Sequence, residues 1–513
     1  MRAVALTEDS ERDDPSARIA RLVKLGSWIP TSRAEWRGPI EALFETFLQH
    51  CERATLSRLL EDQLALPART RPAERLARLA TGLTALHKVC QILARNRALP
   101  EEARAALAPL ERLPGSAIPD MALAKAAGIA TRARPGLRPD PAGAKVGRGS
   151  VADVFRFRGG GAPIAFKTVR PDALPRIQSE ADILKQMADE SAIIAAFAGP
   201  DLAHTIAETL RDAARALLRE IDFPGEVVNL RDAAVFYRSN RRIHVPKPAG
   251  PALDEGLFME FAEGTPLLET SLDQETRRQT ARVLYRSLIL EPLFSGLDQS
   301  IFHADPHAGN ILARKGKNGE VTLVLLDWSQ ADRLPASLRQ ATLELCLCCL
   351  AEDSPPPGVL ERILGIRGEA PRIPMPAEGD PLHKAFAIVE QLATQGNPVP
   401  LSLLLLRKAF LTLEGIALQL DPSFDPWRET LTYGAWVIAS EAPFRAWSIP
   451  FPWLDEPAFY RSGLSTRVLA GRLMGICRKR LFNKLGMREA GESEASNRNR
   501  KSKRETFVHN AYA

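Results

Sequence analysis

The chain has 513 residues, of which 45% are hydrophobic and 25% are charged, as in a globular protein of two or three domains. Its formal net charge is +6, and residues 478–513 alone hold ten Lys/Arg against four Asp/Glu. The rest of the chain is balanced, which argues against a basic nucleic-acid-binding surface. The six cysteines show no disulfide-framework spacing, and three of them cluster in one apolar, helix-like stretch, which indicates reduced, buried thiols in a cytosolic protein.

The N-terminal residues predict neither export nor insertion into a membrane. Residues 1–16 are polar and acidic, lack the apolar stretch of a signal peptide and are predicted to be disordered. No uncharged apolar run reaches about 18 residues, so no transmembrane helix is expected. We expect a cytoplasmic protein whose basic, disordered tail at 486–513 makes peripheral contact with anionic membranes at most.

Helical periodicity dominates the next hundred residues. Apolar positions recur every three or four residues over 17–112, which predicts a helical extension that includes Lys88 and Gln91. Residues 113–145 are rich in Pro, Gly and Arg and are expected to form a linker.

The pattern changes to strands at Lys145. The segment KVGRGSVADVFRFRGGGAPIAFKTV predicts two strands around a glycine turn. Gly147, Gly149 and Ser150 open the first strand, where backbone N–H groups could approach a phosphate. Lys167 lies on the second strand, from which a lysine can reach nucleotide phosphates. A solvated edge lysine is the structural alternative.

Two segments between this hairpin and the centre of the chain add polar candidates. REIDFPGE places Glu220, Asp222 and Glu226 near helix boundaries, either as a solvated acidic face or as partners of a lysine. GLFMEFAEGTPL predicts a strand and turn that resemble a hinge between two lobes, which would bring Met259, Glu260 and Ala262 near an adenine. An ordinary core strand is the alternative.

The most informative segment is 301–329, IFHADPHAGNILARKGKNGEVTLVLLDWS. Two apolar strands flank a turn with Asn318-Gly319, which predicts a hairpin. Asp305 and Asn310 precede the first strand and Asp327 ends the second, so the three side chains can converge. A phosphoryl-transfer site needs this set, because one carboxylate orients the acceptor while a carboxylate and an amide oxygen hold Mg²⁺.

Other interpretations of the same segment remain open. His303 and His307 could belong to a metal-hydrolase cluster, although Pro306 argues against a helical zinc motif. The segment could also be a polar turn without chemistry. After Asp327 the pattern becomes helical, without the A-P-E-like segment of protein kinases, which points away from protein substrates.

Four segments together resemble the UbiB (AarF-like) family of atypical kinases, roughly over residues 80–335. HADPHAGN is similar to the family's HADPHPGN, REIDFPGE to its E-x-D segment with a following glutamate, and IAFKTVRP to its strand with the lysine. LHKVCQILARNRALPEE resembles its K-x-G-Q helical extension. Members of the family are linked to ubiquinone and other isoprenoid-lipid pathways.

The resemblance implies a role for each candidate. Asp305 would be the catalytic aspartate, Asn310 and Asp327 would hold Mg²⁺, and Lys167 would pair with Glu226 and contact the phosphates of ATP. In the extension, Lys88 and Gln91 would lie over the active site, with Lys88 near Glu220 and Asp222. The extension would then block the cleft that binds protein substrates.

The sequence departs from the family pattern at three places. Cys90 replaces the glycine of K-x-G-Q, and the nucleotide loop reads Gly147-Arg148-Gly149-Ser150 instead of an alanine-rich sequence. The metal-binding triplet is Asp327-Trp328-Ser329, which lacks a glycine and is therefore stiffer.

We therefore expect an α+β, two-lobed protein-kinase-like fold and an atypical kinase or ATPase that acts on a small or lipid-like molecule in ubiquinone or isoprenoid-lipid biosynthesis. The alternative is a nucleotide-binding scaffold for lipid-biosynthetic enzymes with little turnover. The expected domains are a disordered N-terminus (1–16), a helical extension (17–112), a linker (113–145), an N-lobe (146–265), a helical C-lobe (266–485) and a basic tail (486–513).

Overall fold

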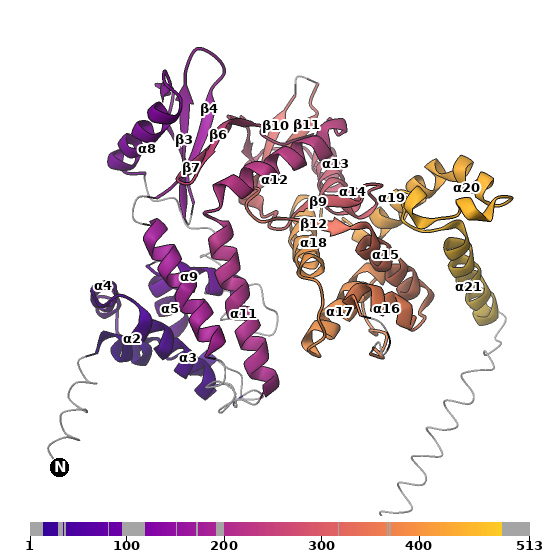
Figure 1. Ribbon diagram of the computed structural model, residues 1–513, viewed down its shortest axis with the longest axis horizontal. Helices are drawn as coiled ribbons and strands as arrows, with labels where there is room; N and C mark the ends of the chain where they lie inside the picture. Colours follow the sequence, from indigo (N-terminus) through magenta and orange to yellow (C-terminus); the bar gives the residue numbers. More distant parts are fainter. Residues whose placement is uncertain are drawn as a thin grey trace, which may run out of the picture. The chain divides into compact units, whose positions relative to one another are not determined.

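The computed structural model describes residues 14–28, 34, 37–80, 82–94, 118–149, 151–170, 173–190, 200–316, 318–366, 368 and 371–484 (Figure 1). Its contacts divide the chain into two compact units. Unit 1 contains residues 1–271 and 305–331, and unit 2 contains residues 272–304 and 332–513. The hairpin of the central motif therefore groups with the N-terminal part of the chain. Residues 266–485 were expected to form one lobe, but the contacts place 266–271 and 305–331 in unit 1.

The main sheet of unit 1 is antiparallel, and its central strands run in the order β1-β3-β4-β7-β6, with β2 paired to β3. Its strands are β1 (Arg138–Pro139), β2 (Lys145–Arg148), β3 (Ala152–Arg158), β4 (Ile164–Val169), β6 (Pro248–Leu253) and β7 (Gly256–Glu260). The predicted strand pair around the glycine turn is β3 and β4.

One row of aromatic side chains forms the core on one face of this sheet. The register places Phe155 opposite Phe166, and Phe166 opposite Phe258. All three are fully buried, and the rings of Phe166 and Phe258 stack at 4.4 Å. Ile129 of α8 (Asp120–Ala133) packs against them. Residues 113–145 were expected to be a linker. For the described part, 118–145, this is a correction, because α8 and β1 lie there and complete the core of the sheet.

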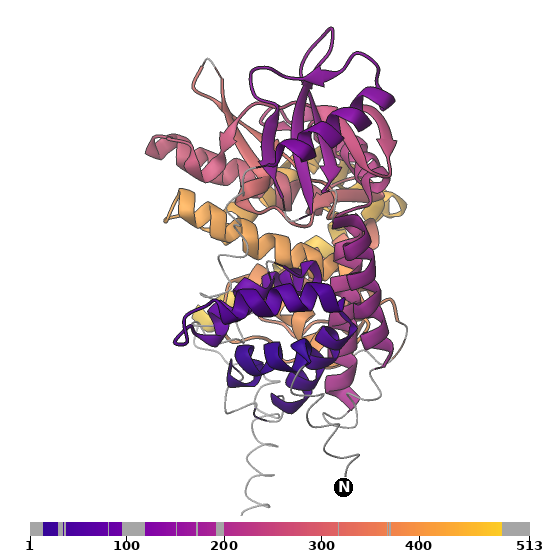
Figure 2. The ribbon, with the colours of Figure 1, turned by 90° about the vertical axis from the view of Figure 1, so that its left-hand side faces the viewer.

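The helical extension packs on two helices that follow the first strands. Its helices are α2 (Pro15–Val23), α3 (Arg37–His50), α4 (Arg53–Leu64), α5 (Pro72–Ala80) and α6 (Thr84–Ala94). Both α3 and α6 contact α9 (Ala173–Asp189), and α6 also contacts α11 (Pro200–Arg219). Figure 2 views the ribbon from the side of the extension. Residues 15 and 16, expected to be disordered, form the first turn of α2, which Asp14 caps.

The central motif forms the predicted hairpin within a second sheet of unit 1. Strands β10 (Ile311–Lys315) and β11 (Val321–Leu325) pair antiparallel, and Gly319 in the turn has a φ of +79°, which glycine adopts without strain. Strands β5 (Ile243–His244) and β8 (Thr265–Pro266) flank the hairpin. The last helix of unit 1 is α12 (Phe223–Phe236).

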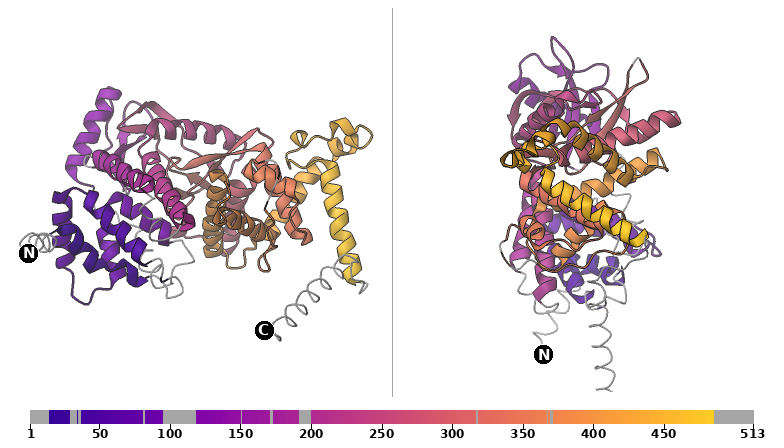
Figure 3. Two further views of the ribbon diagram at one scale, coloured as in Figure 1. Left: turned by 60° about the horizontal axis from the view of Figure 1, so that its bottom comes forward. Right: turned by 90° about the vertical axis from the view of Figure 1, so that its right-hand side faces the viewer.

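Unit 2 is mainly helical (Figure 3). The segment before the central motif consists of α13 (Gln274–Tyr285), a π-helical turn (Arg286–Leu290) and α14 (Glu291–Leu293). Strands β9 (Gln299–His303) and β12 (Ala331–Pro335) pair with each other. The remaining helices are α15 (Ala336–Ala351), α16 (Pro357–Leu364), α17 (Pro381–Thr394), α18 (Leu401–Leu420), α19 (Pro426–Ser440), α20 (Ala442–Ser448) and α21 (Thr466–Lys484).

A histidine between two carboxylates joins α17 to α18. His383 Nδ1 lies 2.8 Å from Asp380 Oδ2, and its Nε2 lies 3.1 Å from Glu414 Oε2. The hydrogen bonds to Asp380 and then to Glu414 raise the pKa of His383 to about 10, against partial burial. The imidazolium therefore stays charged in the folded protein at neutral pH.

This shift predicts that unit 2 becomes less stable in alkali. Because the folded pKa exceeds the ordinary value of 6.5, the stabilisation is complete below about pH 6.5 and is lost as pH rises through about 10. The free energy of unfolding in urea, measured across this window, should fall in the wild type and fall less in His383→Gln. The exposed His50→Gln should retain the wild-type slope, and equal slopes for all three proteins would contradict the prediction.

Candidate nucleotide-binding site

The alternation of side chains along β4 places Lys167 on the face of the sheet opposite the aromatic row. Phe166 faces α8, so its neighbour Lys167 points to the other side, where α12 packs against β6 and β7. The side chain of Lys167 is about one-tenth exposed. Lys167 is therefore a buried residue and not the solvated edge lysine that was the alternative.

Glu226 reaches this lysine from the first turn of α12. Asp222 caps that helix by accepting a hydrogen bond from Gly225 N at 2.9 Å, and Pro224 favours its first turn. The buried stripe of the helix, with Phe223, Val227 and Leu230, contains Glu226 as its one charged member. The local sequence thus directs this carboxylate into the interior.

Lys167 binds two carboxylates at once. Its Nζ donates to Glu226 Oε1 and Oε2, both at 2.9 Å, and to Asp327 Oδ1 at 3.0 Å. Burial lowers the pKa of Lys167, but the charges of Asp327 and Glu226 outweigh it and leave the pKa above its usual value. Burial raises the pKa of Glu226, and the Lys167 ammonium opposes that shift. Lys167 therefore remains protonated.

The residues after Asp327 hold it in a left-handed conformation with a φ of +53°. Ser329 donates to Asp327 Oδ1 from its hydroxyl at 2.7 Å and from its backbone N–H at 3.3 Å. Trp328 is fully buried, and its Nε1 donates to Leu325 O at 3.2 Å. Asn229 of α12 donates to Trp328 O at 3.0 Å. The triplet is thus fixed by a buried indole and by hydrogen bonds on both sides.

Asp305 and Asn310 occupy a tight loop that leads into β10. His307 N donates to Asp305 O at 2.8 Å, and Asn310 Nδ2 donates to the same oxygen at 3.2 Å. Leu326 N donates to Asn310 O at 2.8 Å, which places Asn310 beside the residue that precedes Asp327. The backbone of Asn310 therefore lies beside the end of β11, and the convergence of the three side chains stays a prediction.

The oxygen donors of Asn310, in this loop, and of Asp327, just after β11, fit Mg²⁺. Asn310 uses its amide nitrogen within the loop, so its amide oxygen is the atom that can face a cation, and the side chain of Asp327 is 39% exposed. Mg²⁺ prefers such oxygen donors and is held by one or two protein ligands together with nucleotide phosphates and water. In the metal-hydrolase alternative, His307 would be a ligand, but its Nδ1 accepts a hydrogen bond from Gly309 N at 3.1 Å.

The loop between β2 and β3 contains a close backbone contact. Gly149 N donates to Ala152 O at 2.7 Å, and a Cβ at Gly149 would lie only 3.1 Å from that oxygen. A side chain at Gly149 would therefore press against this backbone oxygen, whereas Gly147, in β2, has open space around it. Ser150 lies outside the described residues.

The predicted hinge residues lie at the end of β7 and just after it. Met259 is buried and lies opposite Ala165 in the sheet, while Glu260 N donates to Lys247 O at 2.8 Å. Ala262 comes just after the strand ends and is half-buried. Met259 and Glu260 lie on β7, the strand next to β4, which carries Lys167, and Ala262 follows two residues later.

The helical extension contributes one ion pair to this part of unit 1. Lys88 of α6 binds Glu220 at the end of α11, and both side chains are largely buried. Asp222 does not join them but caps α12. The side chain of Gln91 lies outside the described residues, and Cys90 is fully buried in α6.

Sequence reasoning did not identify Asn229 or Ser329 as parts of the site. Asn229 follows Glu226 by three residues and so shares its side of α12, which is the signal that could have found it. Ser329 was noted only as a departure from a glycine, although its hydroxyl lies two residues from the carboxylate that it orients.

The fold and the site together define a protein-kinase-like α+β protein, as expected. Residues 143–355 match the family model of the ABC1 atypical kinase-like domain, which supports an atypical-kinase family. That match spans both the Lys167 strand and the Asp305–Asp327 segment. None of the helices that the structure describes has the length and apolar character needed to cross a membrane.

Known relatives share parts of this chain. A probable serine/threonine-protein kinase, abkB, of Dictyostelium discoideum is 30% identical over 144 residues, which are 27% of this chain and 20% of that protein. An uncharacterized protein of Synechocystis sp. is 24% identical over 224 residues, 41% of this chain and 52% of its own. The chain thus spans about a fifth of the length of the first relative and about half of the length of the second.

Among solved structures, a Mycobacterium tuberculosis protein in complex with erythromycin aligns with a TM-score of 0.41. It is 17% identical, and the alignment covers 72% of this chain and 95% of that protein.

The buried pair predicts a non-additive response to mutation. Lys167→Met should lower the free energy of unfolding by about 3 kcal/mol, because Glu226 is left buried without its counter-ion. The double variant Lys167→Met/Glu226→Met should recover part of that loss, since it removes the buried carboxylate together with the ammonium. Urea denaturation of both single variants and the double variant measures the coupling. A double variant whose loss equals the sum of the single losses would contradict it.

Proposed function

We propose that the protein is a Mg²⁺-dependent, ATP-binding atypical kinase or ATPase. The observation that carries the proposal is the joint contact of Lys167 with Glu226 and Asp327, because it ties the strand, helix and hairpin of a kinase-type site together. Lys167 would bind the nucleotide phosphates, Gly147, Gly149 and Ser150 would cover them, and Met259 to Ala262 would contact the adenine. Asn310 and Asp327 would hold Mg²⁺, which neutralises phosphate charge when bound.

In this proposal the protein positions groups and stabilises charge. Asp305 would orient the acceptor hydroxyl or a water and accept its proton. Glu226 would keep Lys167 directed at the phosphates, and Ser329 would keep Asp327 oriented. The contacts of Glu226 and Ser329 exist before the nucleotide binds, which would lower the reorganisation needed during transfer.

We infer a small or lipid-like acceptor rather than a protein. Helix α15 begins at Ala336, nine residues after Asp327, which leaves little chain for a peptide platform. The similarity of HADPHAGN and REIDFPGE to UbiB sequences supports a role in ubiquinone or isoprenoid-lipid biosynthesis. The Lys88–Glu220 ion pair would hold the helical extension in place as the regulatory element.

The second candidate function is a nucleotide-binding scaffold with little turnover. The Asp-Trp-Ser triplet in place of a glycine-containing one favours it, since a stiff loop resists rearrangement during a catalytic cycle. The presence of Lys167, Asp305, Asn310 and Asp327 favours the enzyme, because a scaffold need not keep all four.

The first experiment is a thermal shift of the full chain with ATP or ADP, with and without Mg²⁺. A ligand at 100 times its dissociation constant adds about 2.7 kcal/mol to the stability of the folded state. The wild type should show a shift that depends on Mg²⁺, and Asp327→Asn should lose that dependence. The matched control is Asp254→Asn, an exposed carboxylate in the turn between β6 and β7.

Phosphate release then separates the enzyme from the scaffold. Asp305→Asn should retain the nucleotide-induced shift but lose most of the turnover of the wild type. Binding without turnover in the wild type would favour the scaffold, and no shift with either nucleotide would exclude both.

We also propose that the protein contacts anionic membranes peripherally, through an aromatic surface defined by Phe444, Trp447, Ile449, Trp453 and Phe459. These side chains are between 39% and 72% exposed. They lie on α20 and on the turns that follow it, at one end of unit 2 (Figures 1 and 3). Exposed apolar clusters of this kind are typical of interaction sites, and Trp is favoured at the membrane–water interface.

The charge around the aromatic surface favours an anionic lipid as its partner. Residues 442–484 contain eight Lys/Arg and two Asp/Glu. One of the two acids, Asp455, caps α21 by accepting hydrogen bonds from Thr466 N and Arg467 N. The exposed Arg461 and Arg467 can therefore contact lipid head groups while the indole rings enter the interface.

Vesicle flotation tests this surface. The full chain should bind vesicles of phosphatidylcholine with about one quarter phosphatidylglycerol, and bind pure phosphatidylcholine at least about tenfold more weakly. Trp447→Ser/Trp453→Ser should reduce binding, whereas Met121→Ser, an exposed apolar residue of unit 1, should not.

A further variant separates the aromatic surface from the basic tail. Replacing Arg500, Lys501, Lys503 and Arg504 by Gln should leave most of the binding intact. Loss of binding in that variant, with full binding by the tryptophan variant, would assign the contact to the tail. Absence of vesicle binding by the wild type would leave a protein partner as the occupant of the surface.

A further inference from the structure

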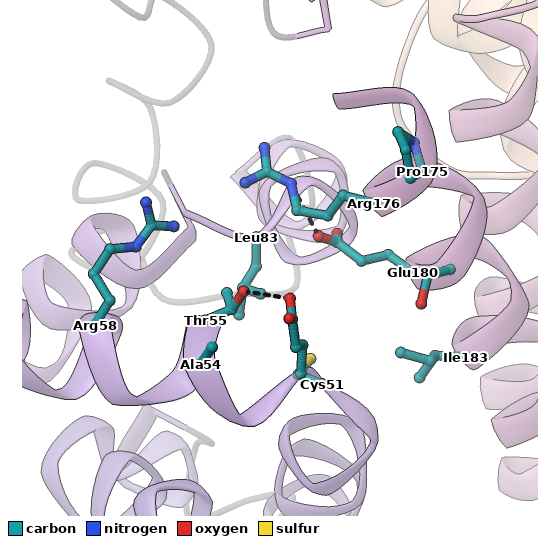
Figure 4. A pocket seen from close by; sticks show the side chains of 11 residues that line it. Cys51, Ala54, Thr55, Arg58, Leu83, Pro175, Arg176, Glu180 and Ile183 are labelled. Carbon is teal, nitrogen blue, oxygen red and sulfur yellow. Dashed lines mark hydrogen bonds and ion pairs between the residues drawn. The ribbon is translucent and has the colours of Figure 1, made fainter. Parts of the chain in front are cut away.

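A large cavity lies in unit 1 among residues that have no part in the proposed nucleotide site. It has a volume of about 710 Å³, is open to solvent on one side, and is lined by α4, the residues that precede α4 and α6, and α9 (Figure 4). Leu83, Ile183 and Pro175 give it an apolar lining. Its volume is in the range of small-molecule sites, which combine apolar walls with a few directed polar groups.

Two guanidinium groups supply the positive charge of this cavity. Arg58 projects from α4 and Arg176 from α9, on either side of Leu83 in the view of Figure 4. Within the described part of the chain, Arg58 makes no ion pair or hydrogen bond. Arg176 Nε is buried without a hydrogen-bond partner there and lies 3.6 Å from Glu180 Oε1. Two such groups are suited to a phosphate or carboxylate, which arginine binds in a bidentate manner.

Glu180 is the second polar feature of the cavity. It is 3% exposed, and its Oε2 accepts a hydrogen bond from Ala85 N at 2.5 Å, in the first turn of α6. Its Oε1 is buried and forms an ion pair with Arg176 Nε at 3.6 Å. This separation is longer than a hydrogen bond, so both atoms keep hydrogen-bonding capacity for a ligand group.

The surroundings of Glu180 favour its neutral form. Burial raises the pKa of Glu180 to about 7, against the hydrogen bonds from the α6 backbone and the charge of Arg176. Glu52 and Arg58 from the α4 side and the thiol of Cys51, whose own pKa burial raises to about 12, line the same cavity. A protonated Glu180 would donate from its carboxyl to an anion held by the arginines.

We propose that this cavity binds an anionic amphiphile, with a phosphate or carboxylate head on Arg58 and Arg176 and an apolar body along Leu83 and Ile183. The head would accept hydrogen bonds from both guanidinium groups, and the body would cover the apolar lining. Because none of the proposed nucleotide-site residues lines the cavity, the inference is independent of the proposed function.

Isothermal titration with octanoate and octyl phosphate tests the cavity on the full chain. Both anions should bind, whereas octanol and inorganic phosphate, which each lack one half of the ligand, should bind at least about tenfold more weakly. Arg58→Gln and Arg176→Gln should each weaken octanoate binding about tenfold. Arg53→Gln, an exposed arginine of the same helix α4 that does not line the cavity, is the matched control.

Two more variants check the position of the site. Ala54→Trp, which places an indole in the cavity from an exposed position of α4, should block binding. Asp327→Asn should leave binding unchanged, which separates this cavity from the nucleotide site. Equal affinities for octanol and octanoate, or equal affinities in the Arg58, Arg176 and Arg53 variants, would overturn the proposal.

The affinity should also depend on pH. Octanoate keeps its charge between about pH 6 and about pH 8, so a change of affinity in this range reports on the protein. Binding should strengthen as pH falls, because the anion favours protonated Glu180. Glu180→Gln retains an acceptor for Ala85 N and cannot titrate, so its affinity should be independent of pH. Stronger binding at the higher pH would contradict the role given to Glu180.

Discussion

The contacts of one buried ammonium organise unit 1. Lys167 comes from the sheet, Glu226 from α12 and Asp327 from the hairpin, and the three polar groups satisfy one another where water has little access. A buried charge is costly unless it is paired, so each of these elements must be placed for the others to be stable. The aromatic row on the opposite face of the sheet supplies the apolar burial that allows this polar centre.

The strands and the hairpin of unit 1 were predicted well, because the local residue pattern determines them. The alternation along IAFKTV and the strand–turn–strand pattern around Asn318-Gly319 indicate strands, and the spacing of Asp305, Asn310 and Asp327 then follows from the hairpin. The α+β kinase-like fold was also expected. These predictions needed only the period of the side chains and the chemistry of a turn.

Other features depend on contacts between distant segments, which no local pattern reveals. Helix α8 was missed because Pro, Gly and Arg around it suggested a linker, although it is held by burial against Phe155 and Phe258. Asn229 binds the backbone of Trp328, about a hundred residues further on. The helical extension is likewise tied by distant partners, Glu180 at the start of α6 and Glu220 beside Lys88. Only the folded chain brings such groups together.

The buried indole of Trp328 has a consequence for inhibitors. In the proposed nucleotide site, a ligand that turns the Asp327-Trp328-Ser329 triplet outward would have to vacate the space that Trp328 fills. Here that movement would remove a fully buried side chain from the core, break its hydrogen bond to Leu325 and release the carbonyl held by Asn229. Removing a large aromatic side chain from a core costs about 3–5 kcal/mol, roughly two to four orders of magnitude in affinity. For the proposed nucleotide site, compounds that accept the inward triplet are therefore the better starting point.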